Sequence, residues 1–495
     1  MNNSNINSIH SRYNPCGEAE RYIASLSLNE NIRFFILIEP GLGYLTAPLR
    51  KRNPHSKIIA LHAGSPARAQ GEEAPDSQWH PGLGISVQDF LDREIPDSEA
   101  SKIKILEWRP ALPVYGGAYL SLVEESAKFI KRADANYRTL KIFGRCWFRN
   151  LFRNLQIIRN VVRPRAMSIP LVITGAGPGL EEQIPLLRKA SNDGKIFILA
   201  VSSSVAALEA GSAAPDMVIS TDGGGWARFH LHECIRSSAH CRTAPSCGAS
   251  AAPVSGGFPL AAAITASLPS QCAGMPVLPI ADGSVWQTTV LKALDIPFIT
   301  LPQRGTVTAS ALDLAFALTK GPVYIAGLDL ANRDIRSHAR PYSLDYFQEE
   351  REARLNPYYS MSFKRSLAMN EGNSFGIYAS WFEKQLSSYP KRLFSLGDNN
   401  IVFGALKASD AISGAADSRE TMDFASFRLE EESASPLKAL NVLEKALRDP
   451  LQSEKLSCEL SALLFPGMKP ASGEELITAL EETGRRLKRS PPGDG

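Results

Sequence analysis

The sequence lacks the features that mark secreted, membrane-spanning and nucleic-acid-binding proteins. Its seven cysteines are scattered singly with no CxxC pair, which argues against a disulfide framework and favours a reducing compartment. No apolar run approaches the roughly 20 residues of a membrane span, and the first residues show no secretory signal pattern. A formal net charge of +3 gives no global field for nucleic acid or an acidic membrane. We therefore expect a cytoplasmic protein with no membrane span and no nucleic-acid partner.

Composition and patterning divide the chain into four segments. The 495 residues are 44% hydrophobic and 21% charged, which is ordinary globular material with room for two or three cores. We expect a smaller α/β domain over residues 1–125 and a basic helical connector over residues 126–168. A central α/β domain should follow over residues 169–409. Residues 410–495 are helix-rich and end in a disordered-looking SPPGDG.

The N-terminal domain is predicted to be a degenerate Rossmann-like unit. The stretch RFFILIEPGLGYLTAPL gives an apolar strand, a turn with Gly41 and Gly43, and a helix. A nucleotide-binding unit should carry an acid at the end of its second strand, where this chain has Leu61, His62 and Ala63. We therefore favour a role in scaffolding or assembly over nucleotide binding.

The connector carries a basic face and an apolar stripe. Arg145, Arg149 and Arg153 recur every four residues and so share one helical face. Beside them runs a stripe formed by Phe143, Trp147, Phe148, Leu151, Phe152 and Leu155. Such a helix can contact nucleic acid or a membrane. The more common case, which we favour, is a stripe packed on the next domain with the charges in solvent.

Strands and helices alternate through the central domain. Strand candidates such as LVIT, IFILAV, MVIS and PVYIAG are separated by helical stretches such as LEEQIPLLRKA. Alternation of this kind predicts a mostly parallel sheet covered by helices on both faces. The fold class is therefore α/β, with a Rossmann-like central domain.

A glycine-rich turn, Gly175-Ala176-Gly177-Pro178-Gly179-Leu180, links the first central strand to a helix. It is not a dinucleotide fingerprint, because no acid ends the following strand, and it is not a P-loop, because no Gly-Lys-Ser/Thr follows. The proline is placed to open the helix. The pattern supports two interpretations equally. Either the turn presents unpaired amides to a phosphate, or it is a plain strand-to-helix turn.

Five segments together resemble the motility accessory factor family, whose members share a domain named after the archaeal 6-hydroxymethylpterin pyrophosphokinase MptE. They are LVITGAGPGLEEQIPLL, AAPDMVISTD, RGTVTASALDLAFAL, VYIAGLDLANRDIRSHA and YASWFEKQL. The resemblance implies a central domain similar to bacterial sialyltransferases. It also implies O-glycosylation of flagellin Ser/Thr in the cytoplasm, with a CMP-activated nonulosonic acid as donor substrate and no cofactor.

The chain departs from the family pattern at three polar places. Gly179 stands where the family has serine, Leu328 stands where it has glutamine, and residues 395–404 replace an Asn-x-Thr-Glu-Gly-Gly segment. With these departures, two alternatives stay open: the activity is weakened, or the protein uses a different donor.

Candidate site residues follow from strand ends and from the resemblance. His338 is the only histidine in the matching motif region, and the resemblance implies that it transfers the proton. Asp222 follows the strand MVIST and is a candidate general base, or else a turn residue. The nucleotide and donor candidates are Gly175, Gly177, Pro178, Gly179, Leu180, Ser202, Ser203, Arg304, Gly305, Thr306 and Asp329.

Each group of candidates has an expected role in binding the donor. The helix-start amides would stabilise the departing phosphate. Ser202 and Ser203 would hydrogen-bond ribose or base, or serve as ordinary helix caps. Arg304 would pair with a donor carboxylate or phosphate, and Asp329 would orient its loop or contact the donor.

Two other functions remain open at this point. The first is diphosphate transfer from ATP to a pterin alcohol, with Mg²⁺ held by Asp222 and Asp329. The second is a non-catalytic flagellin-binding factor. The cluster HLHECIRSSAHC has no established zinc spacing, so we expect no metal. The sequence leaves a homo-oligomer open.

Overall fold

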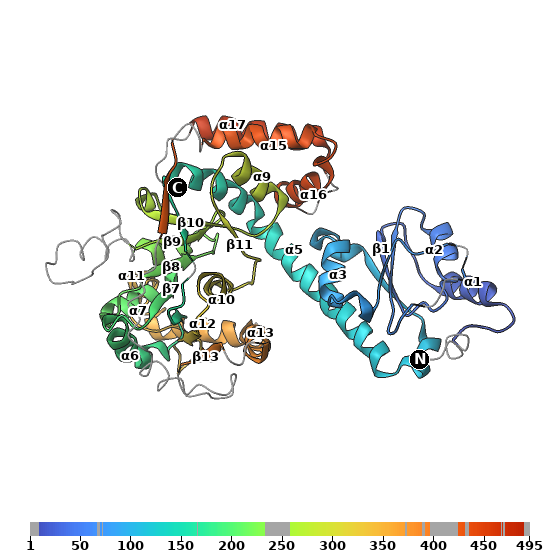
Figure 1. Cartoon of the computed structure of the whole chain (residues 1–495), viewed down its shortest axis with the longest axis horizontal. Helices are drawn as coiled ribbons and strands as arrows, with labels where there is room; N and C mark the ends of the chain where they lie inside the picture. The colour runs from blue at the N-terminus through green and yellow to red at the C-terminus, as the bar shows by residue number, and fades with distance from the viewer. Residues whose placement is uncertain are drawn as a thin grey trace. The chain divides into compact units, whose positions relative to one another are not determined.

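A computed structural model gives the fold of the chain. It describes residues 9–66, 70–71, 73–165, 167–232, 258–371, 374–388, 392–396, 424–430, 435–466, 468 and 471–489. The chain divides into two compact units, Met1–Ile142 and Phe143–Gly495 (Figure 1). No helix in these described ranges combines the length and the apolar character that a membrane crossing requires.

The first unit is a parallel sheet in the strand order β3-β2-β1-β4. Its two central strands, β1 and β2, are short apolar runs whose last four residues are buried. The four strands are β1 (Phe34–Ile38), β2 (Lys57–Leu61), β3 (Ser77–Trp79) and β4 (Ile103–Glu107). Its helices are α1 (Pro15–Ser25), α2 (Thr46–Arg52), α3 (Val87–Glu94), α4 (Leu112–Tyr115) and the start of α5 (Gly117–Ile157).

The glycine turn of the first unit is filled by a side chain of the same unit. The Nε2 atom of His10 accepts a hydrogen bond from the amide of Leu42 at 3.1 Å. A Cβ atom on Gly41, whose φ is +64°, would lie 2.4 Å from that nitrogen. The acid absent from the end of β2 comes instead from Glu39 at the end of β1, whose carboxylate lies 3.4 Å from His62 Nδ1.

The second unit is a mixed sheet in the order β13-β12-β6-β7-β8-β9-β10-β5-β14, with β11 paired to β10. Every recorded strand pair in it is parallel except β14 with β5. The first strands are β5 (Asn160–Pro164), β6 (Leu171–Thr174), β7 (Phe197–Val201), β8 (Met217–Ser220) and β9 (Leu260–Ala263). The others are β10 (Pro276–Ala281), β11 (Ile299–Thr300), β12 (Val323–Ala326), β13 (Leu393–Ser395) and β14 (Phe424–Arg428). The predicted α/β class with a parallel central sheet is confirmed.

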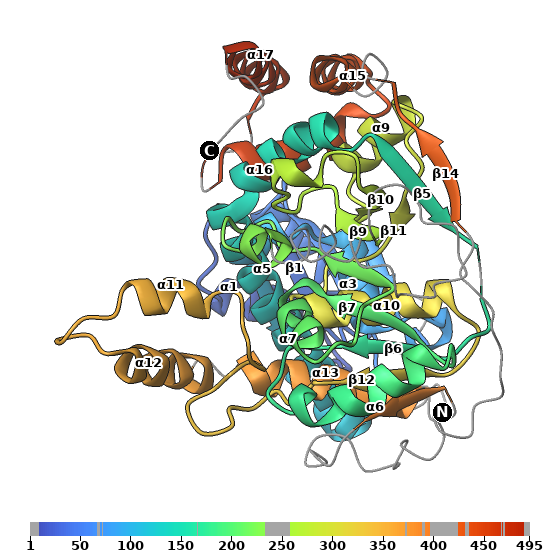
Figure 2. The ribbon, with the colours of Figure 1, turned by 90° about the vertical axis from the view of Figure 1, so that its left-hand side faces the viewer.

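Helices surround this sheet, and a helical layer closes the chain. Those of the central part are α6 (Leu180–Asn192), α7 (Val205–Ala210), α9 (Val285–Ala293), α10 (Val307–Leu318), α11 (Asp345–Glu350), α12 (Tyr358–Glu371) and α13 (Ser374–Ser388). The C-terminal ones are α15 (Pro436–Arg448), α16 (Ser453–Leu464) and α17 (Gly473–Arg489). Helix α15 contacts α9, α16 and α17. Figure 2 shows α11 and α12 lying side by side at one side of the sheet.

Strands β3, β5, β9, β13 and β14 were not among the predicted strands, and two of them lie in segments expected to be helical. Strand β5 falls in the expected helical connector, and β14 falls in the expected helical C-terminal region. The two strands pair with each other, antiparallel, at one edge of the sheet. Each is short and carries a basic residue, Arg163 or Arg428, so neither shows the continuous apolar run of a buried strand.

The last part of α5 is built into the second unit. Phe148, Leu151, Phe152 and Leu155 of the predicted stripe are buried, whereas Phe143 is exposed. The buried amide of Asn154 donates to the carbonyl oxygens of Ile264 and Ala266, both at 2.8 Å. Hydrogen bonds as well as apolar contacts therefore fix this helix against the loop after β9.

We expect Asn154→Leu to lower the free energy of unfolding by about 2–4 kcal/mol, because two buried carbonyl groups lose their donor. Denaturant unfolding of the full chain measures this loss. Arg149→Leu, at an exposed position of the same helix, is the matched control and should change stability by less than about 0.5 kcal/mol. Equal stability of the two variants would show that the Asn154 hydrogen bonds do not hold the helix in place.

Candidate functional site

The carboxyl edge of the second sheet has a topological switch point. From β6 the chain proceeds through β7, β8 and β9 to β10 in one direction, and it later returns to β12 on the other side of β6. Ligands of open α/β sheets bind where the strand order reverses in this way. The ends of β6 and β12 are therefore where a site is expected, and the glycine turn and Asp329 lie at these two ends.

The glycines of the turn are required by the protein's own packing. The amide of Gly177 donates to the carbonyl oxygen of Gly327 at 2.8 Å. A Cβ atom on Gly177 would lie 2.0 Å from Oδ2 of Asp329, and one on Gly175 would lie 2.5 Å from the Gly327 oxygen. Both glycines thus permit the loop after β12 to approach the loop after β6.

The expectation of unpaired amides in this turn is wrong. The amide of Gly179 donates to Oδ2 of Asp329 at 2.9 Å, and the amide of Leu180 donates to the Gly177 carbonyl at 3.0 Å. The helix begins at Leu180 rather than at Pro178. The buried Asp329 carboxylate therefore occupies the place that a helix N-terminus offers to an anion.

The loop after β12 also covers the turn from outside. The amide of Ala339 donates to the carbonyl of Ala176 at 2.8 Å. Glu181 in the first turn of α6 accepts from Arg336 at 3.1 Å and from the backbone amide of Arg340 at 2.9 Å. With these contacts the loop closes the switch point and continues along the edge of the sheet.

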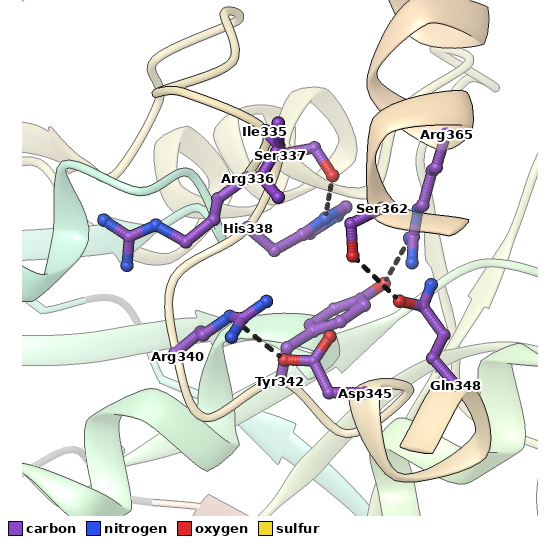
Figure 3. Close-up of a pocket in the computed structure, with 10 residues that line it drawn as sticks. All are labelled: Ile335, Arg336, Ser337, His338, Arg340, Tyr342, Asp345, Gln348, Ser362 and Arg365. Carbon is purple, nitrogen blue, oxygen red and sulfur yellow. Dashed lines mark hydrogen bonds and ion pairs between the residues drawn. The ribbon is translucent and has the colours of Figure 1, made fainter. Parts of the chain in front are cut away.

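A pocket opens between this loop and the helices α11 and α12. Its empty space is about 280 Å³, a figure that includes open solvent, and its lining residues are Ile335, Arg336, Ser337, His338, Arg340, Tyr342, Asp345, Gln348, Ser362 and Arg365. Figure 3 shows Ser362 and Arg365 reaching in from a helix while Arg336 points away from Tyr342. The site is thus displaced from the glycine turn to the outer side of the loop that covers it.

His338 is held by contacts on two sides. The Ser337 hydroxyl lies 2.8 Å from His338 Nδ1. The imidazole stacks on the Tyr342 ring, with centroids 4.1 Å apart. The Arg365 guanidinium donates to the Tyr342 hydroxyl at 3.2 Å and lies over its ring. A neutral tautomer with the proton on Nδ1, shared with Ser337, leaves the Nε2 lone pair to accept a proton.

A second histidine comes from the other side of the loop. His230 follows β8, and its Nδ1 lies within hydrogen-bond distance of the Ser343 hydroxyl. Its ring lies 5.3 Å from the ring of Tyr342. Burial raises the pKa of Tyr342, and the charge of Asp222 adds to the rise, which places this aspartate in the same neighbourhood. The loop therefore brings together groups that follow β8 and β12.

Both histidines stay neutral well below neutral pH. Burial, together with the positive charge of Arg365, lowers the pKa of His338 to about 3. Burial likewise lowers the pKa of His230 to about 4, again with a contribution from Arg365. An anion bound beside Arg365 would offset that charge, so His338 would become a stronger base when an anionic ligand is present.

The two catalytic candidates occupy different settings. His338 lines the pocket, as just described. Asp222 is exposed, and its Oδ1 accepts from the amide of Gly224 at 2.7 Å in a turn. This hydrogen bond is what a structural turn aspartate makes, although one carboxylate oxygen remains outside it.

The remaining candidates lie in a turn, an ion pair or a helix start. Ser202 and Ser203 form a 3-10 turn directly after β7, where Ser202 is buried. Arg304 makes a two-point ion pair with Asp313 of α10, at 2.6 and 3.3 Å, and lies over the Trp381 ring. Asp313 offsets the charge of this guanidinium, so a donor anion would share Arg304 with that carboxylate.

Gly305 and Thr306 shape the start of α10. Gly305 has a φ of +78°, and its carbonyl accepts from Tyr378. The Thr306 hydroxyl accepts from the amide of Ala309 at 3.1 Å as the N-cap.

The geometry does not support one Mg²⁺ between Asp222 and Asp329. They follow β8 and β12, which are three strand positions apart, or about 14 Å. In the part of the chain that the structure describes, no group of three or more His, Cys, Asp or Glu could hold a metal ion. Residues 233–241 of the His/Cys cluster and 397–404 of the altered family segment lie outside the described residues.

Comparison with known proteins bears on the central domain. A family model described as 6-hydroxymethylpterin diphosphokinase MptE-like matches residues 145–251. The chain contains an MptE-like domain. This match confirms the predicted MptE-like resemblance over the part that holds β6, the glycine turn and Asp222.

Two individual proteins are also similar. An uncharacterized protein of Treponema pallidum (strain Nichols) is 29% identical over 298 residues, which are 60% of this chain and 60% of that protein. The match thus spans less than two thirds of that relative's length. The solved Maf glycosyltransferase from Magnetospirillum magneticum AMB-1 is 11% identical, with a TM-score of 0.45, covering 95% of this chain and 82% of that chain.

The sequence did not indicate Tyr342, Arg365 or His230 as site residues. Tyr342 lies four residues after His338, and it could have been noticed as an aromatic neighbour in RSHARPYS. Arg365 is 23 residues further along and enters the pocket only through the position of α12. His230 was considered only for zinc.

We expect the unfolding free energy to fall as the pH drops below about 6.5. The unfolded chain then binds protons that the buried His338 and His230 do not, with a slope of at most about 1.4 kcal/mol per pH unit for each histidine. Denaturant unfolding between pH 7 and pH 5 measures the slope. His338→Gln should reduce the slope, and an unchanged slope would show that this imidazole is not kept neutral by the fold.

We also expect Arg365→Met to raise the pKa of His338, because a nearby positive charge is removed while the burial of the ring remains. NMR titration of the His338 ring resonances gives the pKa directly. Lys364→Met, at the preceding and exposed position of α12, is the control and should leave it unchanged. A His338 pKa equal in the wild type and in Arg365→Met would show that the guanidinium does not act on the ring.

Proposed function

We propose that the protein is a cytoplasmic glycosyltransferase of the motility accessory factor type. It transfers a nonulosonic acid from a CMP-sugar to a Ser/Thr hydroxyl of flagellin. The observation that carries the proposal is the pairing of a neutral His338 with the Arg365 cation in one open pocket beside the carboxyl edge of the sheet whose strands β6, β7 and β8 lie in the MptE-like match. This pairing suits an anionic donor and a hydroxyl acceptor.

In the proposed step the acceptor oxygen attacks the anomeric carbon of the donor. The bond from this carbon to the phosphate oxygen breaks, and CMP leaves with the electron pair. His338 takes the hydroxyl proton on Nε2, while Ser337 holds Nδ1 and keeps the ring oriented. Attack from the face opposite the phosphate inverts the anomeric centre.

Through Arg365, the bound donor can also raise the pKa of His338. A nonulosonic acid carries a carboxylate beside its anomeric carbon, and a guanidinium matches a carboxylate in charge and shape. Because Arg365 contributes to the low pKa of His338, neutralising it would raise that pKa. Donor binding would thereby make the histidine a better base only when the sugar is in place.

The surface beside the pocket suits a protein acceptor. Tyr359, Phe363 and Leu367 follow one another at four-residue spacing along α12 and are 64%, 44% and 40% exposed. They belong to the same helix as Ser362 and Arg365 of the pocket. Exposed apolar side chains gathered in this way are typical of protein-interaction surfaces.

Diphosphate transfer to a pterin is the second candidate, because the matching family model is described as a diphosphokinase. The separation of Asp222 from Asp329 by three strand positions does not favour it. Incubation with ATP, Mg²⁺ and hydroxymethyldihydropterin, followed by mass detection of the diphosphate, tests this reaction.

The deciding experiment is the intact mass of flagellin from cells with and without this protein. We expect the mass in the deletion strain to fall by whole nonulosonic acid units, and His338→Ala to behave like the deletion. Loss of a general base lowers the rate by about 10²–10⁴-fold. An unchanged flagellin mass in the deletion strain would overturn the proposal.

The control for His338→Ala is His80→Ala, which removes a half-buried histidine of the first unit and should restore the full mass. If His338→Ala also restores it, the histidine has no catalytic part. If flagellin binds the protein but is never modified, the non-catalytic factor is the better description.

A further inference from the structure

A second and wider cleft lies at the carboxyl edge of the same sheet, beyond β8 and β9. Its empty space is about 700 Å³, a figure that includes open solvent, and it is lined by Arg153, Arg228, Phe229, His232, Pro269, Ser270 and Gln271. Three of these seven side chains can carry a positive charge, and none can carry a negative one. The cleft is therefore an electropositive surface rather than an apolar one.

This cleft is separate from the His338 pocket. The two share no lining residue. Residues 227–232 are helical and form the wall between them, since His230 contacts Ser343 and Tyr342 whereas Arg228 and His232 line the second cleft. Phe229 packs against Phe347 of α11 with ring centroids 4.4 Å apart, which fixes the wall in place.

Arg153 is positioned by its neighbours on α5. The Asn150 amide donates to the carbonyl oxygens of Gly223 and Thr265, at 3.1 and 2.9 Å, and Asn154 donates to two further carbonyls of the same loop. These buried bonds hold the helix at the rim of the cleft. The guanidinium is half-buried and makes no hydrogen bond or ion pair with any residue that the structure describes.

The side chain of His232, like that of Arg153, is half-buried. Its ring lies 5.9 Å from the Phe229 ring, and it has no hydrogen bond to the described parts of the chain. Cationic groups that are partly withdrawn from water gain most from a ligand that brings both negative charge and hydrogen-bond acceptors.

We propose that this cleft binds the phosphate group of a small phosphorylated ligand. The Arg153 and Arg228 guanidinium groups supply forked donors that match phosphate oxygens, and His232 supplies a third donor. Ser270 and Gln271 on the opposite loop add neutral donors. A phosphate ester brings up to two negative charges into a cleft whose described lining residues include no acid. The proposal is independent of the glycosyltransferase function.

Calorimetric titration of the full-length protein at low ionic strength tests it, with inorganic phosphate, CMP and cytidine as three separate probes. We expect phosphate and CMP to bind and cytidine not to bind. Tighter binding of CMP than of phosphate would indicate a nucleotide, and equal binding would indicate a phosphate site without base recognition. Affinity should fall as salt rises, because exposed charge pairs are screened. Cytidine binding as well as CMP would overturn the proposal.

Variants separate this cleft from the His338 pocket. Arg153→Met and His232→Gln should each weaken phosphate binding, the first by about tenfold or more. Arg149→Met, an exposed arginine one turn earlier on the same helix, should change it by less than twofold. Arg365→Met should also leave it unchanged. Loss of binding in Arg365→Met but not in Arg153→Met would assign the phosphate to the His338 pocket and overturn the proposal, whatever the flagellin mass shows.

Discussion

One hydrogen bond, from the Gly179 amide to the Asp329 carboxylate, joins the two loops that meet where the sheet reverses direction. It places a negative charge of the protein at the start of α6, where the backbone amides favour one. The loop after β12 can then pass over the turn, and Ala339 bonds to Ala176 as it does so. Together with the hydrogen bonds that Glu181 accepts from Arg336 and Arg340, this contact fixes the course of the loop along the sheet edge.

The course of that loop decides the chemistry of the pocket. It sets the His338 ring against Tyr342 and within the field of Arg365, and it meets His230 on the far side. Two neutral imidazoles beside a fixed cation make a site whose basicity depends on its ligand. In the proposed reaction, an anionic donor beside Arg365 would raise the pKa of His338 and so favour proton transfer to it.

The fold could be predicted further than the site. Buried strands such as LVIT are continuous apolar runs, and their alternation with helices predicts the parallel sheet. His338 was identified through the family resemblance, and nothing in its spacing marks it. The occupied amides were missed because Asp329 reaches Gly179 across 150 residues. The ion pair of Arg304 with Asp313 was not predicted, because it joins the loop before α10 to a residue about two turns into that helix. Contacts between elements, rather than patterns within them, decide these cases.

Both glycine turns of this chain are filled from within, by His10 beside Gly41 and by Asp329 beside Gly177. At these positions only glycine leaves room for the neighbouring side chain, so the chain needs glycine there in order to fold, whether or not the turn contacts a substrate. Changes at these glycines would accordingly alter protein yield and solubility before they altered substrate affinity. Loss of activity in such variants would by itself say nothing about catalysis.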